Sequence, residues 1–313
     1  MSKDSFMLFS GTSHPKLSEE IAKSLGIRLG KTQIELFPDG EIGAQILENV
    51  RGRDVFVVQS IAKKPNFYLM ELLILIDALK RASVRSIVAV IPYYGYARQD
   101  RKDKGRVPIT AKLVANLLET AGVTRVITMD LHSEQIQGFF DIPVDNLYAQ
   151  SLFAEKVKTL GMKNPVVCAP DVGSAKLARL MANQLGADFA IVDKQRMNAK
   201  EVETHALIGD VQGRDVVLVD DICSTGTTLK KASEVVKKAG AVRVIAAVTH
   251  PLFNSEMVKE SEIDTFFVTN TVPLPEEIDH SQIEILSVAG IFGKAIDCII
   301  KNESISSLFR PRT

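Results

Sequence analysis

The chain has 313 residues, of which 46% are hydrophobic and 24% charged, and its 38 Lys and Arg balance its 38 Asp and Glu. This length fits two globular domains, and the zero net charge gives no reason to expect nucleic acid or an anionic membrane as a partner. Three widely spaced cysteines without a CxxC pattern argue against a disulfide framework or a structural zinc site, and favour a reducing compartment.

The amino terminus and the most apolar stretch bear on the location of the protein. The apolar patch in "MSKDSFMLFSGTSHP" is far too short for a signal peptide. The stretch "YLMELLILIDALKRA" from Tyr68 carries Glu71, Asp77 and Lys80 and falls short of a membrane span. We therefore expect a buried helix there, and a cytoplasmic protein with no membrane and no nucleic-acid partner.

Short runs rich in Val and Ile alternate with helical segments along the chain. The first half shows, in order, "DVFVVQ", "FYLMELLILIDALKRA", "SIVAVIPY", "TAKLVANLLETAG" and "RVITMDL". Continuous rather than alternating apolar strands are typical of a parallel sheet covered on both faces. The pattern predicts an α/β fold with doubly wound parallel sheets, in which ligands bind beyond the carboxyl ends of the strands.

The two halves of the chain resemble each other. "VRGRDVFVVQSI" from Val50 and "VQGRDVVLVDDI" from Val211 share seven of twelve residues at a distance of 161 positions. "VRSIVAV" and "VRVIAAV" lie 158 positions apart, and "SGTSHPKLSEEIAKSLG" resembles "PDVGSAKLARLMANQLG" at 160. This near-constant spacing predicts an internal duplication into two similar domains, 1–148 and 149–313. The alternative is that two unrelated α/β units share such phrases.

The stretch "DVVLVDDICSTGTTLKKA" from Asp215 carries the clearest chemistry. An apolar strand ends in Asp220 and Asp221, and small residues then lead into a helix. Backbone N–H groups at a helix start, joined by hydroxyls, can bind a phosphate, whereas two carboxylates suit sugar hydroxyls or a divalent cation. The pattern predicts a pentose phosphate site. The plainer alternative is an Asp cap with a polar turn.

These residues resemble the binding loop of phosphoribosyl diphosphate-binding proteins. The whole chain resembles the ribose-phosphate diphosphokinase (phosphoribosyl-pyrophosphate synthetase) family, in its class I-like form. The blocks that carry the resemblance follow in family order: "FPDGE", "PYYGYARQDRKD", "DLHSEQIQGFFDIPVDNL", "APDVGSAK", "DKQR" and "VVLVDDICSTGTTL".

The resemblance implies an activity and partners. Family members transfer the diphosphoryl group of ATP to the C1 hydroxyl of ribose 5-phosphate, giving 5-phosphoribosyl 1-diphosphate and AMP for the biosynthesis of nucleotides, His, Trp and NAD. It also implies Mg²⁺ as cofactor, and homo-oligomers, commonly hexamers. One alternative is a phosphoribosyltransferase that consumes phosphoribosyl diphosphate, although a single such domain would suffice for that enzyme. The other alternative is a non-catalytic regulatory subunit of the same fold.

The resemblance also implies which residues form the site. Ribose 5-phosphate is expected at Arg196, Asp220, Asp221, Ser224, Thr225, Gly226, Thr227 and Thr228. ATP is expected at Phe37, Asp39, Gly40, Glu41, Arg98, Gln99 and Arg101, with the aromatic face on adenine and guanidinium groups on phosphates. The metal site is expected at His132 and Asp171, and the catalytic cations at Lys194 and Arg196, in a polar stretch that would close over substrate.

Some of these assignments have plainer alternatives. A charge run such as "RQDRKDKGR" is usually a solvated loop, and a lone His after a strand is usually structural. The binding loop also departs from the commonest family form, with Ser224 in place of Asp and Thr227 in place of Gly. A β-branched residue is strained at positive φ, so either Gly226 takes any unusual torsion or the phosphate loop is altered.

Overall fold

A computed structural model of the chain describes residues 6–196, 203–253 and 255–309. These residues form two compact units. The first contains residues 6–148, Thr271–Pro273 and Ser287–Phe309, and the second contains the described residues of Ala149–Asn270 together with Leu274–Leu286. As domain limits, 1–148 and 149–313 stay a prediction.

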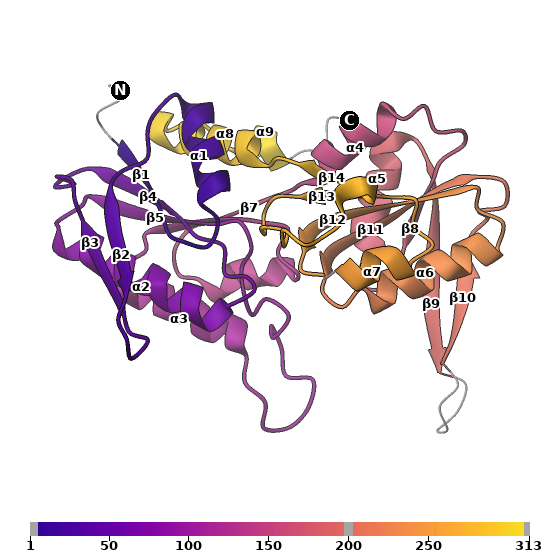
Figure 1. The fold of residues 1–313 in the computed structure, drawn as a ribbon, viewed down its shortest axis with the longest axis horizontal. Helices are drawn as coiled ribbons and strands as arrows, with labels where there is room; N and C mark the ends of the chain where they lie inside the picture. The colour runs from indigo at the N-terminus through magenta and orange to yellow at the C-terminus, as the bar shows by residue number, and fades with distance from the viewer. Residues whose placement is uncertain (1–5, 197–202, 254, 310–313) are drawn as a thin grey trace. The chain divides into compact units, whose positions relative to one another are not determined.

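The first unit is built around a parallel sheet with the strand order β1-β4-β5-β6-β7. Its elements are β1 (Phe6–Ser10), α1 (Pro15–Leu25), β2 (Thr32–Leu36), β3 (Ile42–Ile46), β4 (Asp54–Val58), α2 (Pro65–Arg81), β5 (Ser86–Ile91), α3 (Thr110–Ala121), β6 (Arg125–Met129), the 3-10 helix η2 (Glu134–Phe139), β7 (Val144–Leu147), α8 (Ala289–Lys301) and α9 (Ser306–Phe309). Strands β2 and β3 form a separate antiparallel hairpin. Helices α1 and α8 cover one face of the sheet, and α2 and α3 cover the other (Figure 1).

The second unit has the strand order β10-β9-β8-β11-β12-β13-β14, parallel except between β9 and β10. Its elements are α4 (Gln150–Lys158), β8 (Val166–Ala169), α5 (Ala175–Leu185), β9 (Asp188–Arg196), β10 (Glu203–Ile208), β11 (Asp215–Cys223), α6 (Thr227–Lys238), β12 (Arg243–Pro251), α7 (Ser255–Glu260), β13 (Thr265–Thr269), the 3-10 helix η3 (His280–Gln282) and β14 (Ile283–Leu286). Helices α4 and α5 lie on one face of this sheet and α6 and α7 on the other (Figure 1).

The repeat predicted from the sequence is present in the strand order. The order β8-β11-β12-β13-β14 in the second unit matches β1-β4-β5-β6-β7 in the first. The hairpin β2–β3 follows α1 as the hairpin β9–β10 follows α5. Two α/β units with parallel sheets are therefore confirmed, and the sequence repeat marks equivalent strands in them.

The strands are buried as their continuous apolar composition predicts. In β4 every residue after Asp54 is buried, and in β11 the run from Val216 to Asp220 is buried. The apolar stretch from Tyr68 forms α2, whose Leu72 and Leu75 are fully buried. Among the described residues, no helix has the length and apolar character needed to cross a membrane.

The last helix of each half belongs to the unit built by the other half. Helix α4 follows β7 of the first sheet but packs against α5 in the second unit. Helix α8 follows β14 of the second sheet but packs against α1 in the first. The contact between α1 and α8 is close, because a Cβ at Gly293 would lie 2.1 Å from Oγ of Ser24. The two halves thus exchange their final helices.

The strand order in the second unit identifies where a ligand can bind. Strands β9 and β11 lie on opposite sides of β8, so the chain leaves the first strand of this unit in two directions. Such a switch point leaves a crevice beyond the carboxyl ends of the two central parallel strands. The crevice is therefore expected at the ends of β8 and β11, where Asp171 and Asp220 lie.

Candidate active site

Three predicted acids of the second unit meet at this switch point. Ser174, which precedes α5, links them: its Oγ lies 2.7 Å from Oδ1 of Asp220 and 3.3 Å from Oδ1 of Asp171. The backbone N–H of Ser174 donates to the same Asp171 oxygen over 3.1 Å, and that of Asp221 donates to Oδ1 of Asp220 over 3.0 Å. Asp171, Asp220 and Asp221 therefore form one hydrogen-bonded cluster.

The cluster concentrates negative charge in a buried place. Asp220 is only 8% exposed, whereas Asp171 and Asp221 are half-buried. Burial first, and then the charge of Asp221, raise the pKa of Asp220 above its usual range, and the hydrogen bond from Ser174 acts in the opposite direction. A group of acids held in this way is stabilised by a ligand that brings hydrogen-bond donors or a cation.

The loop after β11 turns at Gly226. This residue adopts the left-handed conformation, with a φ of 76°, and precedes α6. Thr227 is the first residue of α6 and keeps a helical backbone, so the substitution of Thr for Gly at that position causes no strain. A Cβ at Gly226 would lie 1.9 Å from Cγ of Met257, so both the torsion and the packing require glycine. Of the two alternatives for this loop, the first is confirmed.

The turn presents polar donors at the start of α6. Thr225, Thr227 and Thr228 are exposed, and the hydroxyls of Thr225 and Thr227 lie 3.2 Å apart. Gly226, which directly precedes α6, has no side chain that could cap this helix. N–H groups at a helix start, with neighbouring hydroxyls, form a site suited to a phosphate group. Between this turn and the acids, Cys223 is buried, and burial raises the pKa of its thiol, which keeps it protonated.

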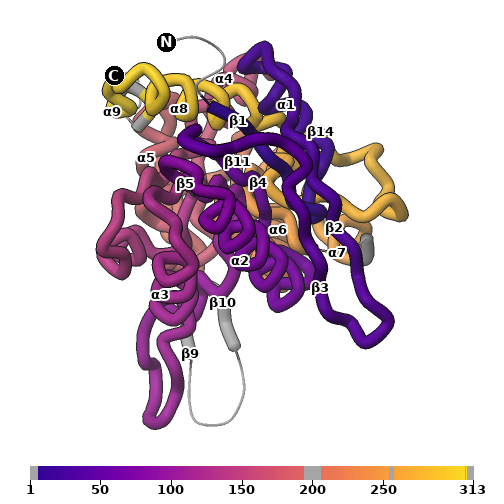
Figure 2. Tube along the Cα trace, turned by 90° about the vertical axis from the view of Figure 1, so that its left-hand side faces the viewer, coloured from indigo at the N-terminus to yellow at the C-terminus, as the bar shows by residue number. Residues whose placement is uncertain are grey.

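The residues expected to bind adenine lie at the tip of the hairpin β2–β3. The turn is closed by hydrogen bonds from the N–H of Phe37 to the Glu41 carbonyl (2.8 Å) and from the N–H of Gly40 to the Phe37 carbonyl (2.9 Å). The Asp39 carboxylate accepts from the Glu41 N–H over 3.2 Å. The Phe37 ring is 43% exposed, and Figure 2 shows the hairpin extending past the sheet of its own unit. An exposed aromatic ring on a fixed turn can stack on a planar base.

The basic loop lies after β5 and is exposed. Arg98, Gln99 and Arg101 are all exposed. Its beginning is fixed, because Tyr94 is buried and donates from its hydroxyl to the Ala111 carbonyl over 3.0 Å. The side-chain oxygen of Gln99 accepts a hydrogen bond from Oγ1 of Thr110 over 2.5 Å. The loop is therefore fixed where it begins and exposes its guanidinium groups.

The expected metal ligands lie in different units. His132 follows β6 in the first unit and is exposed, and Asp171 follows β8 in the second. Their pairing remains a prediction. Within residues 6–196, 203–253 and 255–309, no group of three or more His, Cys, Asp and Glu side chains has the arrangement of a metal site. Asp171 is a suitable oxygen ligand for Mg²⁺, whereas imidazole is an unusual one.

The expected catalytic cations lie at the end of β9. The backbone of Lys194 and Arg196 pairs with that of His205 and Glu203 in β10. Their side chains lie outside the described part of the chain, as do residues 197–202. Their catalytic role therefore stays a prediction.

The equivalent place in the first unit is filled by its own side chains. Gln59 and Ser60, which follow β4, are equivalent in the repeat to Asp220 and Asp221 of β11, and Glu71 of α2 is fully buried beside them. Glu71 accepts hydrogen bonds from the N–H of Thr12 (2.6 Å), its hydroxyl (2.5 Å) and Nε2 of Gln59 (2.8 Å). The carboxylate is thus satisfied internally, and a Cβ at Gly11 would lie 2.3 Å from Oε1 of Gln59. The first unit therefore supplies the hydrogen-bond partners of this buried carboxylate from its own residues.

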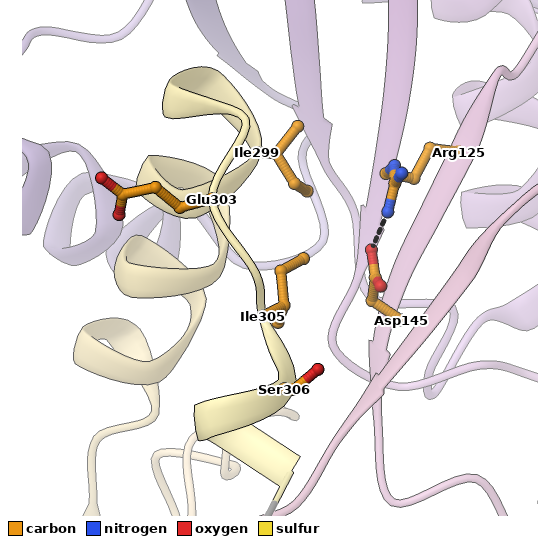
Figure 3. A pocket seen from close by; sticks show the side chains of 6 residues that line it. All are labelled: Arg125, Asp145, Ile299, Glu303, Ile305 and Ser306. Carbon is orange, nitrogen blue, oxygen red and sulfur yellow. Dashed lines mark hydrogen bonds and ion pairs between the residues drawn. The ribbon is translucent and has the colours of Figure 1, made fainter.

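A cavity of about 250 Å³ lies elsewhere in the first unit. Arg125 of β6 and Asp145 of β7 form an ion pair of 2.6 Å on one side of it. Figure 3 shows the carboxy-terminal residues opposite that pair, and its lining is Arg125, Asp145, Ile299, Glu303, Ile305 and Ser306. The sequence-predicted site residues do not line it, so it is separate from the acidic cluster.

Sequence reasoning missed the residue that joins the cluster. Ser174 lies inside the block "APDVGSAK", but a serine before a helix has the ordinary meaning of a cap, and only the fold shows it bonded to Asp220. The internal network around Glu71 was missed as well. Its signal was a glutamate inside an otherwise apolar buried helix, which requires partners.

Known proteins match both halves of the chain. Residues 6–122 match the family described as the N-terminal domain of ribose phosphate pyrophosphokinase, and residues 144–281 match the phosphoribosyl transferase domain. A ribose-phosphate pyrophosphokinase of Wolinella succinogenes is 54% identical, over 97% of this chain and 99% of the relative. One of Campylobacter jejuni is 48% identical, over 97% and 99%.

A solved structure also matches over nearly the whole length. The crystal structure of phosphoribosylpyrophosphate synthetase from Mycobacterium smegmatis is 39% identical, covers 96% of this chain and 100% of its own, and has a TM-score of 0.91. The chain belongs to the ribose-phosphate pyrophosphokinase family. The resemblance seen in the sequence is thereby confirmed. In this member of the ribose-phosphate pyrophosphokinase family, the acidic cluster and the turn before α6 lie in the half that matches the phosphoribosyl transferase domain.

Proposed function

We propose that the chain is a ribose-phosphate pyrophosphokinase that makes 5-phosphoribosyl 1-diphosphate and AMP from ribose 5-phosphate and ATP. The C1 hydroxyl oxygen of the sugar forms a bond to the β-phosphorus of ATP. The bond between that phosphorus and the oxygen bridging to the α-phosphorus breaks, AMP leaves with the bridging oxygen, and the hydroxyl proton is lost. The product supplies nucleotide biosynthesis.

The observation that carries this proposal is the acidic cluster close to the start of a helix that follows a turn of small polar residues, in a chain of this family. Asp220 and Asp221 lie in the last part of β11, which ends at Cys223, and the turn at Gly226 leads from there into α6. Donors at the helix start suit the 5-phosphate, and the carboxylates accept hydrogen bonds from the sugar hydroxyls. The acids come first along the chain and would face the sugar hydroxyls, and the phosphate donors follow and would face the 5-phosphate.

The ATP side of the site is proposed from the first unit. Phe37 would stack on adenine, while Asp39, Gly40 and Glu41 form the turn that fixes it. Arg98, Gln99 and Arg101 would bind the phosphates from the basic loop.

Magnesium is proposed as the cofactor, held by Asp171 and His132. Bound there, it would neutralise charge on the phosphate oxygens of ATP. Asp171 fits this role, because its carboxylate is half-buried and already oriented by the backbone N–H of Ser174. The fit of His132 rests on its place at the end of β6 alone.

Lys194 and Arg196 are proposed to stabilise the negative charge of the transferred group in the transition state. Phosphoryl transfer depends mainly on alignment and charge neutralisation rather than on covalent help. Two cations at the end of β9, in the same unit as the sugar site, suit this task.

Assembly and location are also proposed. The family resemblance supports a homo-oligomer, and a hexamer in particular. Helix α3 exposes Leu113 and Leu117, one turn apart, which gives the first unit an apolar strip suited to a subunit contact. The free cysteines and the nucleotide substrates support a cytoplasmic location.

The test is an assay of AMP release with Mg²⁺, ATP and ribose 5-phosphate. We expect AMP to appear only when both substrates are present, with one 5-phosphoribosyl 1-diphosphate formed for each AMP. A chain that instead joins a nucleobase to 5-phosphoribosyl 1-diphosphate without ATP would be a phosphoribosyltransferase. One that binds ATP without turnover would be a regulatory subunit.

A further inference from the structure

Ser174 occupies a position where a serine normally stabilises its helix. It directly precedes α5, and a serine there usually accepts a hydrogen bond from an amide of the first turn. In the described part of the chain Ser174 makes no such bond, and its backbone is helical (φ −85°, ψ −1°) rather than extended. Its hydroxyl is therefore used for something other than capping.

That hydroxyl is directed at the acids of the site. Ser174 is 6% exposed, and its single O–H hydrogen has two carboxylate oxygens within reach, 2.7 Å away on Asp220 and 3.3 Å away on Asp171. The shorter distance favours Asp220. Asp171 does not depend on the hydroxyl, because the Ser174 backbone N–H already donates to it over 3.1 Å.

Two donors at one oxygen fix the plane of the Asp220 carboxylate. The Ser174 hydroxyl and the Asp221 backbone N–H both donate to its Oδ1. Without the hydroxyl, a carboxylate that is 8% exposed keeps one donor at that oxygen and can rotate. A buried charged acceptor that loses a donor is among the costlier hydrogen-bond losses.

The equivalent residue of the first unit behaves differently, which shows that the fold itself does not require this contact. His14 lies 160 positions before Ser174 in the aligned repeat. It precedes α1 and caps that helix, because its Nδ1 accepts from the Leu17 N–H over 3.4 Å. The side chain at this position thus caps its own helix in the first unit and donates a hydrogen bond to Asp220 in the second.

We propose that Ser174 is a positioning residue of the ribose 5-phosphate site, whose hydroxyl holds the Asp220 carboxylate in place for the sugar hydroxyls. The inference rests on the proposed function, since it needs Asp220 to bind the sugar. It adds a residue outside the acid pair and the phosphate turn, and one that acts through Asp220 rather than by touching substrate.

The experiment compares Ser174→Ala with Ser174→Thr, which keeps a hydroxyl. We expect Ser174→Ala to raise KM for ribose 5-phosphate about 10-fold, with kcat and KM for ATP changed less than about threefold. Calorimetric titration with ribose 5-phosphate alone should show a similar rise in Kd. Ser174→Thr should recover most of the affinity.

A matched control is Ser18→Ala. Ser18 is a buried serine of α1 whose hydroxyl bonds to the His14 carbonyl over 3.2 Å, so its loss tests the removal of a buried hydroxyl in general. We expect it to leave KM and Kd for ribose 5-phosphate unchanged.

Three outcomes would overturn the inference. Unchanged KM and Kd in an active Ser174→Ala would remove it alone and leave the proposed function in place. Equal losses in the Ala and Thr variants would show that the hydroxyl is not responsible. A wild-type chain that forms no 5-phosphoribosyl 1-diphosphate would overturn the proposed function, and this inference with it.

Discussion

The polar side chains at the equivalent strand ends of the two units have different hydrogen-bond partners. In the first unit Gln59 follows β4 and is hydrogen-bonded to the buried carboxylate of Glu71, which has three donors. In the second unit Asp220 occupies the equivalent position, and its neighbours include two further acids. One switch point is closed by internal partners, and the other is left with unbalanced charge.

The difference shows that equivalent strand ends in a duplicated fold can carry polar groups with different partners. A buried polar group needs partners, and these come either from the chain or from a ligand. The glutamate of α2 supplies them in the first unit. In the second unit α6 has Ser233 near the equivalent turn, and its hydroxyl bonds to the Lys230 carbonyl instead. We propose that the acids there receive their remaining partners from the substrate.

The largest effect should come from the ends of the two hairpins. Lys194→Ala at the end of β9 should lower kcat by about 10²–10³-fold with little change in Kd for ribose 5-phosphate, because a transition-state contact is lost.

Phe37→Ala at the tip of β2–β3 should instead raise KM for ATP and leave kcat unchanged. Steady-state kinetics with both substrates varied would distinguish these patterns.

The exposed Lys158→Ala, at the end of α4, is the control for the loss of a positive charge. It should leave both constants at the wild-type level. A Lys194→Ala variant with wild-type kcat would show that the two hairpins do not differ in the expected way.

A carboxylate-to-amide change should separate the two strand ends. Asp220→Asn should weaken ribose 5-phosphate binding by about 10–100-fold, because a charged acceptor is lost. It should also raise the thermal midpoint of the ligand-free chain at neutral pH, since it removes a buried charge. The raised pKa of Asp220 means that the folded state holds the proton more tightly than the unfolded state.

The sign of the pH dependence follows from that shift. The stability contributed by protonated Asp220 is present at low pH and is lost as pH rises from about 4, the unfolded value, through the raised folded pKa. The Asn variant should therefore show a flatter midpoint curve across this window than the wild type. Thermal unfolding measured from acid to neutral pH without ligands checks this, and a lower midpoint for the variant at pH 8 would contradict it.

The same chemical change in the first unit should act in the opposite direction. In Glu71→Gln an NH2 group replaces one of the two carboxylate oxygens, which accept hydrogen bonds from the N–H and the hydroxyl of Thr12. One donor of Thr12 then faces another donor, which should lower the free energy of unfolding by about 1–3 kcal/mol. Kd for ribose 5-phosphate should not change. Urea denaturation, with Glu19→Gln on the exposed side of α1 as control, measures the loss. A Glu71→Gln chain as stable as that control would show that the network is not what closes the first unit.

The smallest effect should come from the base of the first hairpin. Glu48, which follows β3, accepts hydrogen bonds from both terminal nitrogens of Arg28 at 2.6 and 2.7 Å. This contact lowers the pKa of Glu48 to about 2. Because Arg28 is largely exposed, Glu48→Gln should lower the midpoint by only about 1 °C at neutral pH. A depressed pKa gives stability that is present above about pH 4 and is lost as pH falls through 2. The two chains should therefore converge there in differential scanning calorimetry, and a gap that persists at pH 2 would contradict this account.

The architecture was largely predictable because parallel strands buried on both faces leave a strong pattern. The runs that became β4, β5 and β11 are continuous and apolar, and their spacing along the chain revealed the duplication. The exchange of α4 and α8 left no such pattern. The apolar stripe of a helix shows that the helix packs against something, and the sequence does not say against which unit.

The site was predictable in part. The acids at the end of β11 and after β8 were expected to matter, and the fold brings them into one cluster. Gly226 rather than Thr227 takes the left-handed torsion, which the sequence had left open. The hydrogen bond from Ser174 to Asp220 could not be foreseen, because a serine before a helix usually caps that helix and only the position of β11 beside β8 brings Asp220 within reach.

The exchanged helices bear on how the protein is made. The first sheet and α1 leave the ribosome early, but α8, which covers α1, is among the last segments to be synthesised. Until then α1 lacks the helix against which it packs in the folded unit. Nascent chains of the first half should therefore need protection by chaperones, and a fragment ending at Tyr148 should aggregate when expressed alone.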